Sequence, residues 1–417
     1  MKGTEAPPVT GELRRGWRLL VASTAGMSVG SLHIHSLGAF MQPLQAEFGW
    51  PRSTIAGALT IVSIACVLLS APTGIVVDRW GSRRIAIAGI ITMCSGVAAL
   101  SLAGPSIASW LMLWLIVALG VVMTNPTIWS AAITGVFDRH RGMALAIMLC
   151  GTALSSSTLP YLATTLIARE GWRLTYLILA GVWGAVALPL VLLFFFDRRG
   201  SPTPIVAELR AHAMPPEPGP AEAMRSATFI KLALAGLFLS MGLIGSSVHL
   251  IPILSDLGFA RTTAAAIVSL AGPSAIVGRL GTGIMLDRIR TPLVAAVAVA
   301  VPILGFAILL SGALSMPAAI AATVLIGFGI GAELDTIAFL VARYFGLRHF
   351  GRLYGLIVAL LGLASGVGPF LAGSAFDHYG SYRYWLLFAA PACAFASLML
   401  ATLGRYPAAD VPAEAAR

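Results

Sequence analysis

The sequence predicts an all-α membrane protein with twelve transmembrane helices arranged as two pseudo-symmetric six-helix bundles. Three observations lead to this fold class. Hydrophobic residues make up 58% of the 417 residues and charged residues only 11%, whereas a soluble domain is about one quarter charged. Apolar stretches of about 20 residues, the length that crosses the hydrocarbon core, recur along the chain. The second half of the chain also repeats the first half in a constant register.

The apolar stretches are bounded by Arg, Gly or Pro, so the spans can be placed in order. The first stretch is too long for a signal peptide and lacks a small-residue cleavage site, so we expect it to remain as a helix. The expected spans cover residues 17–42, 54–77, 85–103, 107–136, 143–167, 172–195, 228–254, 262–286, 292–313, 316–342, 352–376 and 382–403.

Lys and Arg are unevenly distributed between the two sides of this topology. With both termini inside, 21 of the 27 basic residues fall in interior segments and Arg279 falls within a span. The exterior loops hold only Arg52, Arg169, Arg173, Arg261 and Arg383. Because positive charge is retained on the cytoplasmic side, we expect both termini in the cytoplasm.

The remaining composition narrows the class further. Topology and anionic lipid explain the net charge of +10, so no nucleic-acid partner is needed. All four cysteines lie within expected spans without metal-ligand spacing (Cys66, Cys94, Cys150 and Cys393), so we expect no disulfide, metal or cofactor. Only two basic residues are Lys, and the single Asn, Asn125, precedes Pro126 and forms no glycosylation sequon. These features favour a bacterial inner (plasma) membrane.

The internal repeat appears at an offset of 209 residues. Pro43, Gly49 and Arg52 fall on Pro252, Gly258 and Arg261, and Gly74, Asp78 and Arg79 fall on Gly283, Asp287 and Arg288. A constant register over such a length indicates a duplicated unit. We therefore expect an N-terminal bundle (1–196), a polar cytoplasmic linker (197–227) and a C-terminal bundle with a short tail (228–417).

The loop between the second and third spans carries a resemblance to a known family. The segment Gly74-Ile-Val-Val-Asp78-Arg79-Trp-Gly81-Ser-Arg83-Arg84 resembles the signature loop of the major facilitator superfamily, with a weaker copy at Gly283 to Arg288. The resemblance implies the major facilitator fold and a carrier that closes alternately at its two ends. The residues expected to latch the inner gate are Asp78, Arg79, Arg83, Asp287 and Arg288. The alternative is that these charged residues only satisfy the positive-inside rule, which retains their loops in the cytoplasm.

A narrower similarity points to the monocarboxylate transporter branch and its bacterial relatives. It rests on "RRGWRLL" at 14–20, "PLQAEFGWPRSTIAGA" at 43–58, "HLIPILSDLGFA" at 249–260 and Arg279 within the eighth span. Eukaryotic carriers of that branch place an Asp beside the Arg in this helix. In this chain the eighth span contains no Asp or Glu before Asp287, so proton coupling would use a carboxylate from another part of the protein.

Differences between the repeats indicate where a solute binds, because the scaffold is common to both halves. At the offset of 209 residues, Arg279 aligns with Ser70, Glu333 with Thr124 and Asp335 with Pro126. At 1.5 Å per residue all three acidic and basic groups lie about 12 to 15 Å from one membrane face. We expect Arg279 to bind an anion and Glu333 or Asp335 to hold it and carry the proton. The alternative is a permanent salt bridge that only locks two helices.

Further polar residues in the spans are weaker candidates. Asn125, His249, His33 and Tyr384 are expected near the solute; His35 is less favoured, as are Tyr161 and Tyr382, because interfacial Tyr commonly anchors a helix end. Asp256 is a further proton-coupling candidate. Pairs of Glu47 with Arg52, and of Asp256 with Arg261, are more simply interpreted as solvated loop charges than as an outer gate.

These features predict a secondary active transporter, not an enzyme, that takes up a small organic anion such as a monocarboxylate with protons and works as a monomer in the lipid bilayer. The chain has no Walker A motif, so ATP is not expected to drive transport. The alternative on the same fold is an exporter of drugs or metabolites by proton antiport. A membrane enzyme or a receptor is disfavoured because no catalytic constellation or signalling domain is present in the sequence.

Overall fold

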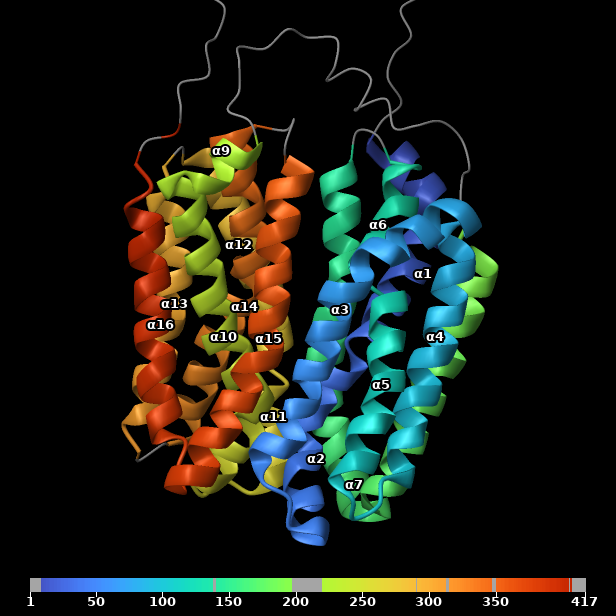
Figure 1. Cartoon of the computed structure of the whole chain (residues 1–417), viewed down its shortest axis with the longest axis vertical. Coiled ribbons are helices and arrows are strands. Elements are labelled where there is room, and N and C mark those ends of the chain that lie inside the picture. Colours follow the sequence, from blue (N-terminus) through green and yellow to red (C-terminus); the bar gives the residue numbers. More distant parts are fainter. Residues whose placement is uncertain are drawn as a thin grey trace, which may run out of the picture.

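The structure is a computed structural model that describes residues 9–137, 140–196, 220–289, 291–312, 315–346, 350–404 and 406. These residues are almost entirely helical and contain no strand. Figure 1 shows the helices running roughly parallel in two groups, with α1–α7 in one bundle and α10–α16 in the other. We call these groups the N-terminal half and the C-terminal half.

The N-terminal half contains six spans, two of them broken. Its helices are α1 (Val9–Gly30), α2 (Leu32–Phe48), α3 (Arg52–Trp80), α4 (Ser82–Ala99), a short 3-10 turn (Leu100–Leu102), α5 (Ile107–Met123), α6 (Pro126–Thr134) and α7 (Arg141–Phe194). The first span breaks at Ser31 and the fourth at Asn125, where Pro126 begins a new helix. The long α7 contains two spans that meet at Gly171, whose φ of 79° is not helical.

The C-terminal half has the same plan. Its helices are α10 (Ala227–Asp256), α11 (Arg261–Val268), α12 (Ala271–Arg288), α13 (Leu293–Leu310), α14 (Met316–Phe345), α15 (Phe350–Tyr379) and α16 (Arg383–Ala401), and the short α9 (Pro220–Arg225) precedes them. Together α11 and α12 form the eighth span. Most of the expected linker, residues 197–219, lies outside the described residues.

The twelve expected spans are confirmed. Ten described helical stretches are long and apolar enough to cross a membrane. One of them, Gly142–Phe194, contains the fifth and sixth spans. The first span is divided between α1 and α2. Helices α3 and α15 extend a few residues beyond the expected spans because their ends continue into polar sequence, which hydropathy does not mark as helical, whereas α13 and α16 end within them.

The backbone reproduces the sequence repeat. Helices α3 and α11 begin at Arg52 and Arg261, and helices α7 and α15 begin at Arg141 and Phe350, each pair 209 residues apart. Four turns also match in pairs: Gly49 and Gly258 have φ values of 69° and 98°, and Gly171 and Gly380 have values of 79° and 66°. Glycine adopts this left-handed region without a steric penalty. The repeat therefore specifies equivalent chain reversals in both halves.

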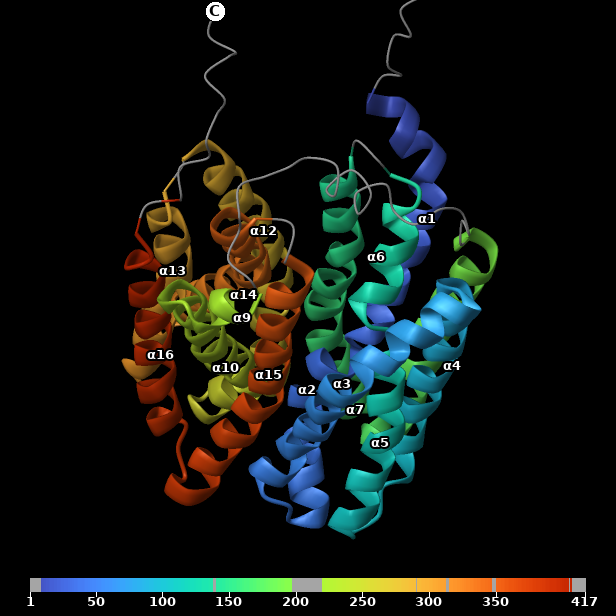
Figure 2. The ribbon, with the colours of Figure 1, turned by 45° about the horizontal axis from the view of Figure 1, so that its top comes forward.

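The two ends of the molecule differ. At one end α7 finishes and α9 begins, and α1 starts and α16 finishes at this end as well (Figures 1 and 2). We call it the linker end. At the opposite end α2 finishes and α3 begins at Arg52, and we call this the Arg52 end. Figure 1 shows the ribbons of the two halves side by side at the Arg52 end and further apart at the linker end.

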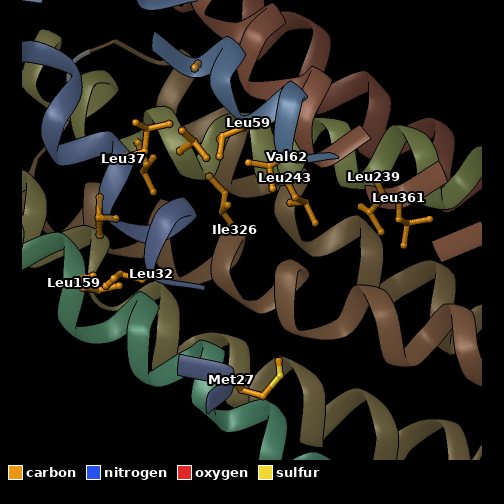
Figure 3. Packing of buried hydrophobic residues seen from close by; sticks show 14 of the residues in the cluster. Met27, Leu32, Leu37, Leu59, Val62, Leu159, Leu239, Leu243, Ile326 and Leu361 are labelled. Atoms are coloured by element: carbon orange, nitrogen blue, oxygen red, sulfur yellow. The ribbon is translucent and has the colours of Figure 1, made fainter. Parts of the chain in front are cut away.

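One hydrophobic cluster runs through both halves. Leu59 and Val62 of α3 belong to the same cluster as Leu243 of α10 and Ile326 of α14 (Figure 3). Other large apolar residues remain exposed, for example Leu68 and Val277. An exposed apolar exterior around a buried interhelical core is the arrangement expected of a protein that faces lipid.

Candidate functional site

A central cavity of about 330 Å³ lies between the two halves. It is lined by α2, α7, α10, α12, α14, α15 and the break between α1 and α2. Most of its wall is aliphatic, and no Phe, Tyr or Trp is among the described residues that line it. The polar residues of the wall are Ser31, His35, Cys150, Thr152, Ser156, Ser240, Arg279, Glu333 and Ser365. An apolar cavity with a few convergent polar groups is typical of a small-molecule site.

Some residues that line the cavity occupy equivalent positions in the two halves. Ser31 and Ser240 are 209 residues apart, as are Ser156 and Ser365, and all four line the cavity. These serines were not predicted, because only residues that differ between the repeats were candidates; polar residues that recur at the offset of 209 mark them. Against this symmetric background, Arg279 and Glu333 have no ionisable counterpart.

Arg279 reaches the cavity from α12 and contacts Asp335 of α14. Its Nε atom lies 3.0 Å from Oδ2 of Asp335, and the two side chains are 16% and 35% exposed. Close packing of the helices makes this contact possible: a Cβ added at Gly278 would lie 2.1 Å from the carbonyl oxygen of Phe328, and one at Gly331 would lie 1.9 Å from that of Ala275. Small residues allow membrane helices to approach at such distances.

The Arg279–Asp335 contact is an ion pair without hydrogen-bond alignment. Oδ2 of Asp335 makes no hydrogen bond to any described residue. Arg279 lines the cavity and Asp335 does not. The guanidinium therefore has a countercharge behind it and faces an open volume in front, where a second carboxylate has room to engage its planar N–H donors.

Glu333 faces the cavity while Asp335 faces Arg279. Glu333 is only 4% exposed, and its Oε1 atom has no hydrogen-bond partner among the described residues. Two residues along a helix correspond to a rotation of about 200°, which explains why these neighbouring acids point to different surroundings. The structure thus separates two carboxylates whose roles the sequence left open: one contacts the arginine and the other lines the solute space.

The histidines of the first span also separate. His35 lines the cavity from the N-terminal half. His33 does not line it; its Nδ1 atom lies 3.0 Å from the carbonyl oxygen of Gly30, and its ring lies near the edge of Trp114. His35, the less favoured of the two in the sequence, is therefore the one placed to contact a solute.

Two other candidates lie away from the cavity. Asn125 caps α6, since its Oδ1 atom accepts hydrogen bonds from the backbone N–H and the hydroxyl of Thr127. Tyr384 is 52% exposed at the start of α16 and its ring packs against Tyr379. A direct contact of these residues with a solute in this cavity stays a prediction.

His249 is fully buried in the C-terminal half, outside the cavity lining. Its Nε2 atom lies 2.8 Å from the carbonyl oxygen of Pro369 and its Nδ1 atom lies 2.7 Å from the hydroxyl of Tyr382. A carbonyl oxygen only accepts, so Nε2 donates to Pro369. In the tautomer whose proton is on Nε2, Nδ1 accepts from the hydroxyl of Tyr382. His249 thus fixes the orientation of Tyr382.

Arg52 of the N-terminal half inserts its guanidinium into the C-terminal half. Its Nη1 atom lies 2.7 Å from Oδ2 of Asp256, and its Cζ atom lies 3.6 Å from the ring centre of Phe376 and 5.3 Å from that of Tyr382. We call Asp256, Phe376 and Tyr382 the Arg52 socket. The interpretation of Arg52 as a solvated loop charge is wrong, because Arg52 is only 5% exposed. Its partner is Asp256 rather than the expected Glu47, and the pair joins the two halves.

Glu47 and Arg261, the other members of the two expected loop pairs, also contact residues other than those expected. Glu47 accepts hydrogen bonds from Trp172 and Arg173 within its own half, at 2.5 and 2.6 Å. The hydrogen bond from Trp172, together with Arg173, lowers the pKa of Glu47. Arg261 donates to the carbonyl oxygen of Ala39 across the halves. Asp256, the further proton-coupling candidate, pairs with Arg52 at the Arg52 end and does not line the central cavity.

A second cross-half contact at this end involves Asp377 of α15. Its carboxylate accepts the backbone N–H groups of Arg52 and Ser53, at 2.9 and 2.8 Å. Pro51 precedes α3 and provides no side-chain cap, so the other half of the molecule caps this helix. Asp377 was not predicted, although its counterpart in the repeat is Ala168, so it differs between the halves in the same way as Arg279.

The predicted inner-gate residues lie at the linker end. Arg79, Asp287 and Arg288 are exposed, and Arg83 donates to the carbonyl oxygen of Leu192 within its own half at 2.6 Å. The side chain of Asp78 lies outside the described part of the chain. Their gating role stays a prediction.

Comparison with known proteins identifies the family. A family profile described as Major Facilitator Superfamily matches residues 19–346. The chain belongs to the Major Facilitator Superfamily. It is therefore a multi-pass membrane protein of a transporter family, and the family resemblance stated from the signature loop is confirmed.

Similar proteins include an MFS-type transporter and proteins named monocarboxylate transporters. An uncharacterized MFS-type transporter, YhjX, of Escherichia coli (strain K12) is 24% identical over 367 residues, covering 84% of this chain and 86% of its own. Monocarboxylate transporter 13 of Bos taurus is 25% identical over 379 residues, covering 88% and 84%. Monocarboxylate transporter 11 of Homo sapiens is 25% identical over 401 residues, covering 90% and 80%.

Solved structures support the fold. A bacterial homolog of the human lysosomal transporter Spinster, in an inward-facing and unoccupied conformation, has a TM-score of 0.72 at 17% identity and covers 96% of this chain and 100% of its own. A D-xylose-proton symporter has a TM-score of 0.72 at 14% identity, covering 94% and 98%. At these identities the likeness concerns the fold alone.

Proposed function

We propose that this protein is a proton-coupled carrier that takes up a small organic anion, a monocarboxylate, across a bacterial inner membrane. The observation that carries the proposal is the position of Arg279: it lines the central cavity and contacts Asp335 behind it through an ion pair without hydrogen-bond alignment. A cation within a membrane helix is retained at a cost of at least about 2.5 kcal/mol, so it commonly has a function.

The anion would bind by engaging the free face of the guanidinium. In the empty carrier Asp335 neutralises Arg279. An entering carboxylate offers two oxygens to the same donors in a low-dielectric cavity, where charge-assisted hydrogen bonds are strong. The apolar wall around Arg279 receives the hydrocarbon part of the solute. One guanidinium in the lining favours a single carboxylate over a dicarboxylate.

Glu333 is the residue we assign to the proton. It lines the same cavity and is buried. A charged Glu333 would repel an entering anion, so binding of the anion favours protonation of this carboxyl. Proton and anion then cross together, and the net charge of the cavity changes little during the cycle.

The Arg52 end supplies the closure on one side. Arg52 with Asp256, and Asp377 with the start of α3, join the halves there. In the other conformation these contacts separate and the predicted latch at the linker end, with Asp78, Arg79, Arg83, Asp287 and Arg288, closes. With the termini and linker in the cytoplasm, the Arg52 end faces outward and a monomer suffices, since the cavity lies within one chain.

Relatives of this chain support the substrate class. Two of the similar proteins are named monocarboxylate transporters, and the E. coli relative supports a bacterial inner-membrane location. The proposed division into bundles at 1–196 and 228–417 with a linker between them fits the two sets of helices.

Counterflow into proteoliposomes tests the proposal. For counterflow, vesicles preloaded with unlabelled lactate, an aromatic monocarboxylate or a dicarboxylate are diluted into the labelled compound. In a separate assay of net uptake, vesicles without solute receive the same compound from outside while a fluorescent probe records the pH of the lumen. We expect counterflow with monocarboxylates and acidification of the lumen during net uptake. Alkalinisation during solute uptake would indicate antiport and favour the exporter, and absence of counterflow with every anion would overturn the substrate class.

A further inference from the structure

The Arg52 socket has the composition of a recognition site for organic cations. Asp256 contributes a carboxylate that faces the guanidinium at 2.7 and 3.4 Å. Phe376 and Tyr382 provide aromatic rings whose centres are 4.8 Å apart, and the guanidinium carbon lies 3.6 Å from the first. A carboxylate beside aromatic faces is the arrangement that binds guanidinium and ammonium groups. In this conformation the chain's own Arg52 is the ligand.

The socket belongs to the C-terminal half alone and is held in shape by that half. The hydroxyl of Tyr382 donates to Nδ1 of buried His249, which in turn is held by the carbonyl oxygen of Pro369. Asp256 lies at the end of α10 and Phe376 on α15. None of these contacts requires Arg52, so the socket is preorganised when the N-terminal half withdraws.

A separate cavity adjoins the socket and gives room for a ligand larger than a single guanidinium. It has a volume of about 220 Å³ and is lined by all three socket residues together with Leu257, Ser381 and Arg383, among others. This volume is several times the ~30 Å³ that a water molecule occupies in the liquid. A cation with a small hydrocarbon body would place its head at Asp256 and its body here.

The local charges favour a cation. The carboxylate of Asp256 binds the guanidinium of Arg52, and the carboxylate of Asp377 accepts the backbone N–H groups of Arg52 and Ser53. Arg383 also lines the cavity, but it is exposed at the start of α16. Removal of the Arg52 side chain therefore leaves the carboxylate of Asp256 without its paired cation, and Arg383 is the basic residue among the described residues that line the cavity.

We propose that the Arg52 socket is a second binding site, distinct from the central cavity, that takes small guanidinium or alkylammonium cations when Arg52 withdraws. A bound cation occupies the position to which Arg52 must return. Such a cation is therefore a competitive inhibitor of closure at the Arg52 end. The inference concerns only this end of the molecule and does not depend on the identity of the transported solute.

Thermal unfolding of the full-length protein in lipid nanodiscs tests the site with methylguanidinium as the probe. A ligand that binds only the folded protein raises its unfolding temperature in a saturable manner. In Arg52→Gly we expect saturable stabilisation with a midpoint of about 1 to 10 mM, as for a single weakly bound group. In the wild type the midpoint should be at least about tenfold higher, because Arg52 competes from within the chain.

Matched variants make the result decisive. Asp256→Asn added to Arg52→Gly should abolish the response, and Arg383→Ser added to it should lower the midpoint. Arg173→Gly, which removes an exposed arginine paired within one half, should respond like the wild type. If Arg52→Gly does not fold, Arg52→Lys should give an intermediate midpoint. Equal responses with and without Asp256, or no response of Arg52→Gly beyond that to sodium chloride, would overturn the proposal.

Discussion

The cap that Asp377 provides across the halves leads to a quantitative prediction for Asp377→Asn. The carboxylate accepts two backbone N–H groups at 2.9 and 2.8 Å. Hydrogen bonds to a charged acceptor are worth about 1.5 to 3 kcal/mol and neutral ones about 0.5 to 1.5 kcal/mol. The amide retains one oxygen, so one bond is weakened and the other is lost. Because Asp377 is exposed, we reduce the expected loss to about 1 to 2 kcal/mol of closure at the Arg52 end, given solvent screening.

This loss should lower the ratio of closed to open molecules at the Arg52 end by about 5- to 30-fold. Spin labels at Ala46 and Ala260, two small exposed residues at this end on opposite halves, would report the change by pulsed electron paramagnetic resonance as a longer-distance population. The control is Glu170→Gln, which neutralises an exposed carboxylate beside the Gly171 turn. Unchanged distances in Asp377→Asn, or the same change in the control, would refute a role of the cap in closure.

Three further predictions concern the cavity and its surroundings. Glu333→Gln should retain counterflow of the anion but lose acidification of the lumen, and continued proton movement would exclude Glu333 as the carrier. Gly331→Val should lower the unfolding free energy by about 1 to 3 kcal/mol and reduce uptake, because its side chain meets the backbone of Ala275; a fully stable, active variant would contradict this helix contact. The lowered pKa of Glu47 predicts that its pairing stabilises the protein above the ordinary carboxyl pKa of 4.5 and that this contribution disappears as the pH falls through the lowered pKa. The difference in unfolding temperature between wild type and Glu47→Gln should therefore be present at about pH 7 and vanish in acid, and a difference that grows in acid would be incompatible with it.

Hydropathy and the internal repeat sufficed to predict the fold. Apolar length sets the number of spans, and the offset of 209 residues places equivalent turns such as Gly171 and Gly380. The same offset marked Arg279, since a cation opposite Ser70 serves no requirement common to both halves. These are local or periodic properties, which a single sequence records directly.

Contacts between helices were less predictable. The spacing of Glu333 and Asp335 showed that they point apart, but only the rotation of α14 against α12 decides which acid meets Arg279. His249 resembled a ligand for the solute because its partners, Tyr382 and Pro369, lie more than 100 residues away. Arg52 resembled a loop charge because burial at the junction of two halves depends on how the halves meet.

The measurement that tests the central claim most directly is uptake of a labelled monocarboxylate by proteoliposomes containing Arg279→Lys. Lysine keeps the positive charge and its partner Asp335 but loses the planar pair of donors. We expect uptake to fall by about 10- to 150-fold, corresponding to about 1.5 to 3 kcal/mol of charge-assisted hydrogen bonding, with an unfolding temperature close to that of the wild type. Uptake at the wild-type rate would contradict the account, because Arg279 would then be only a lock between α12 and α14.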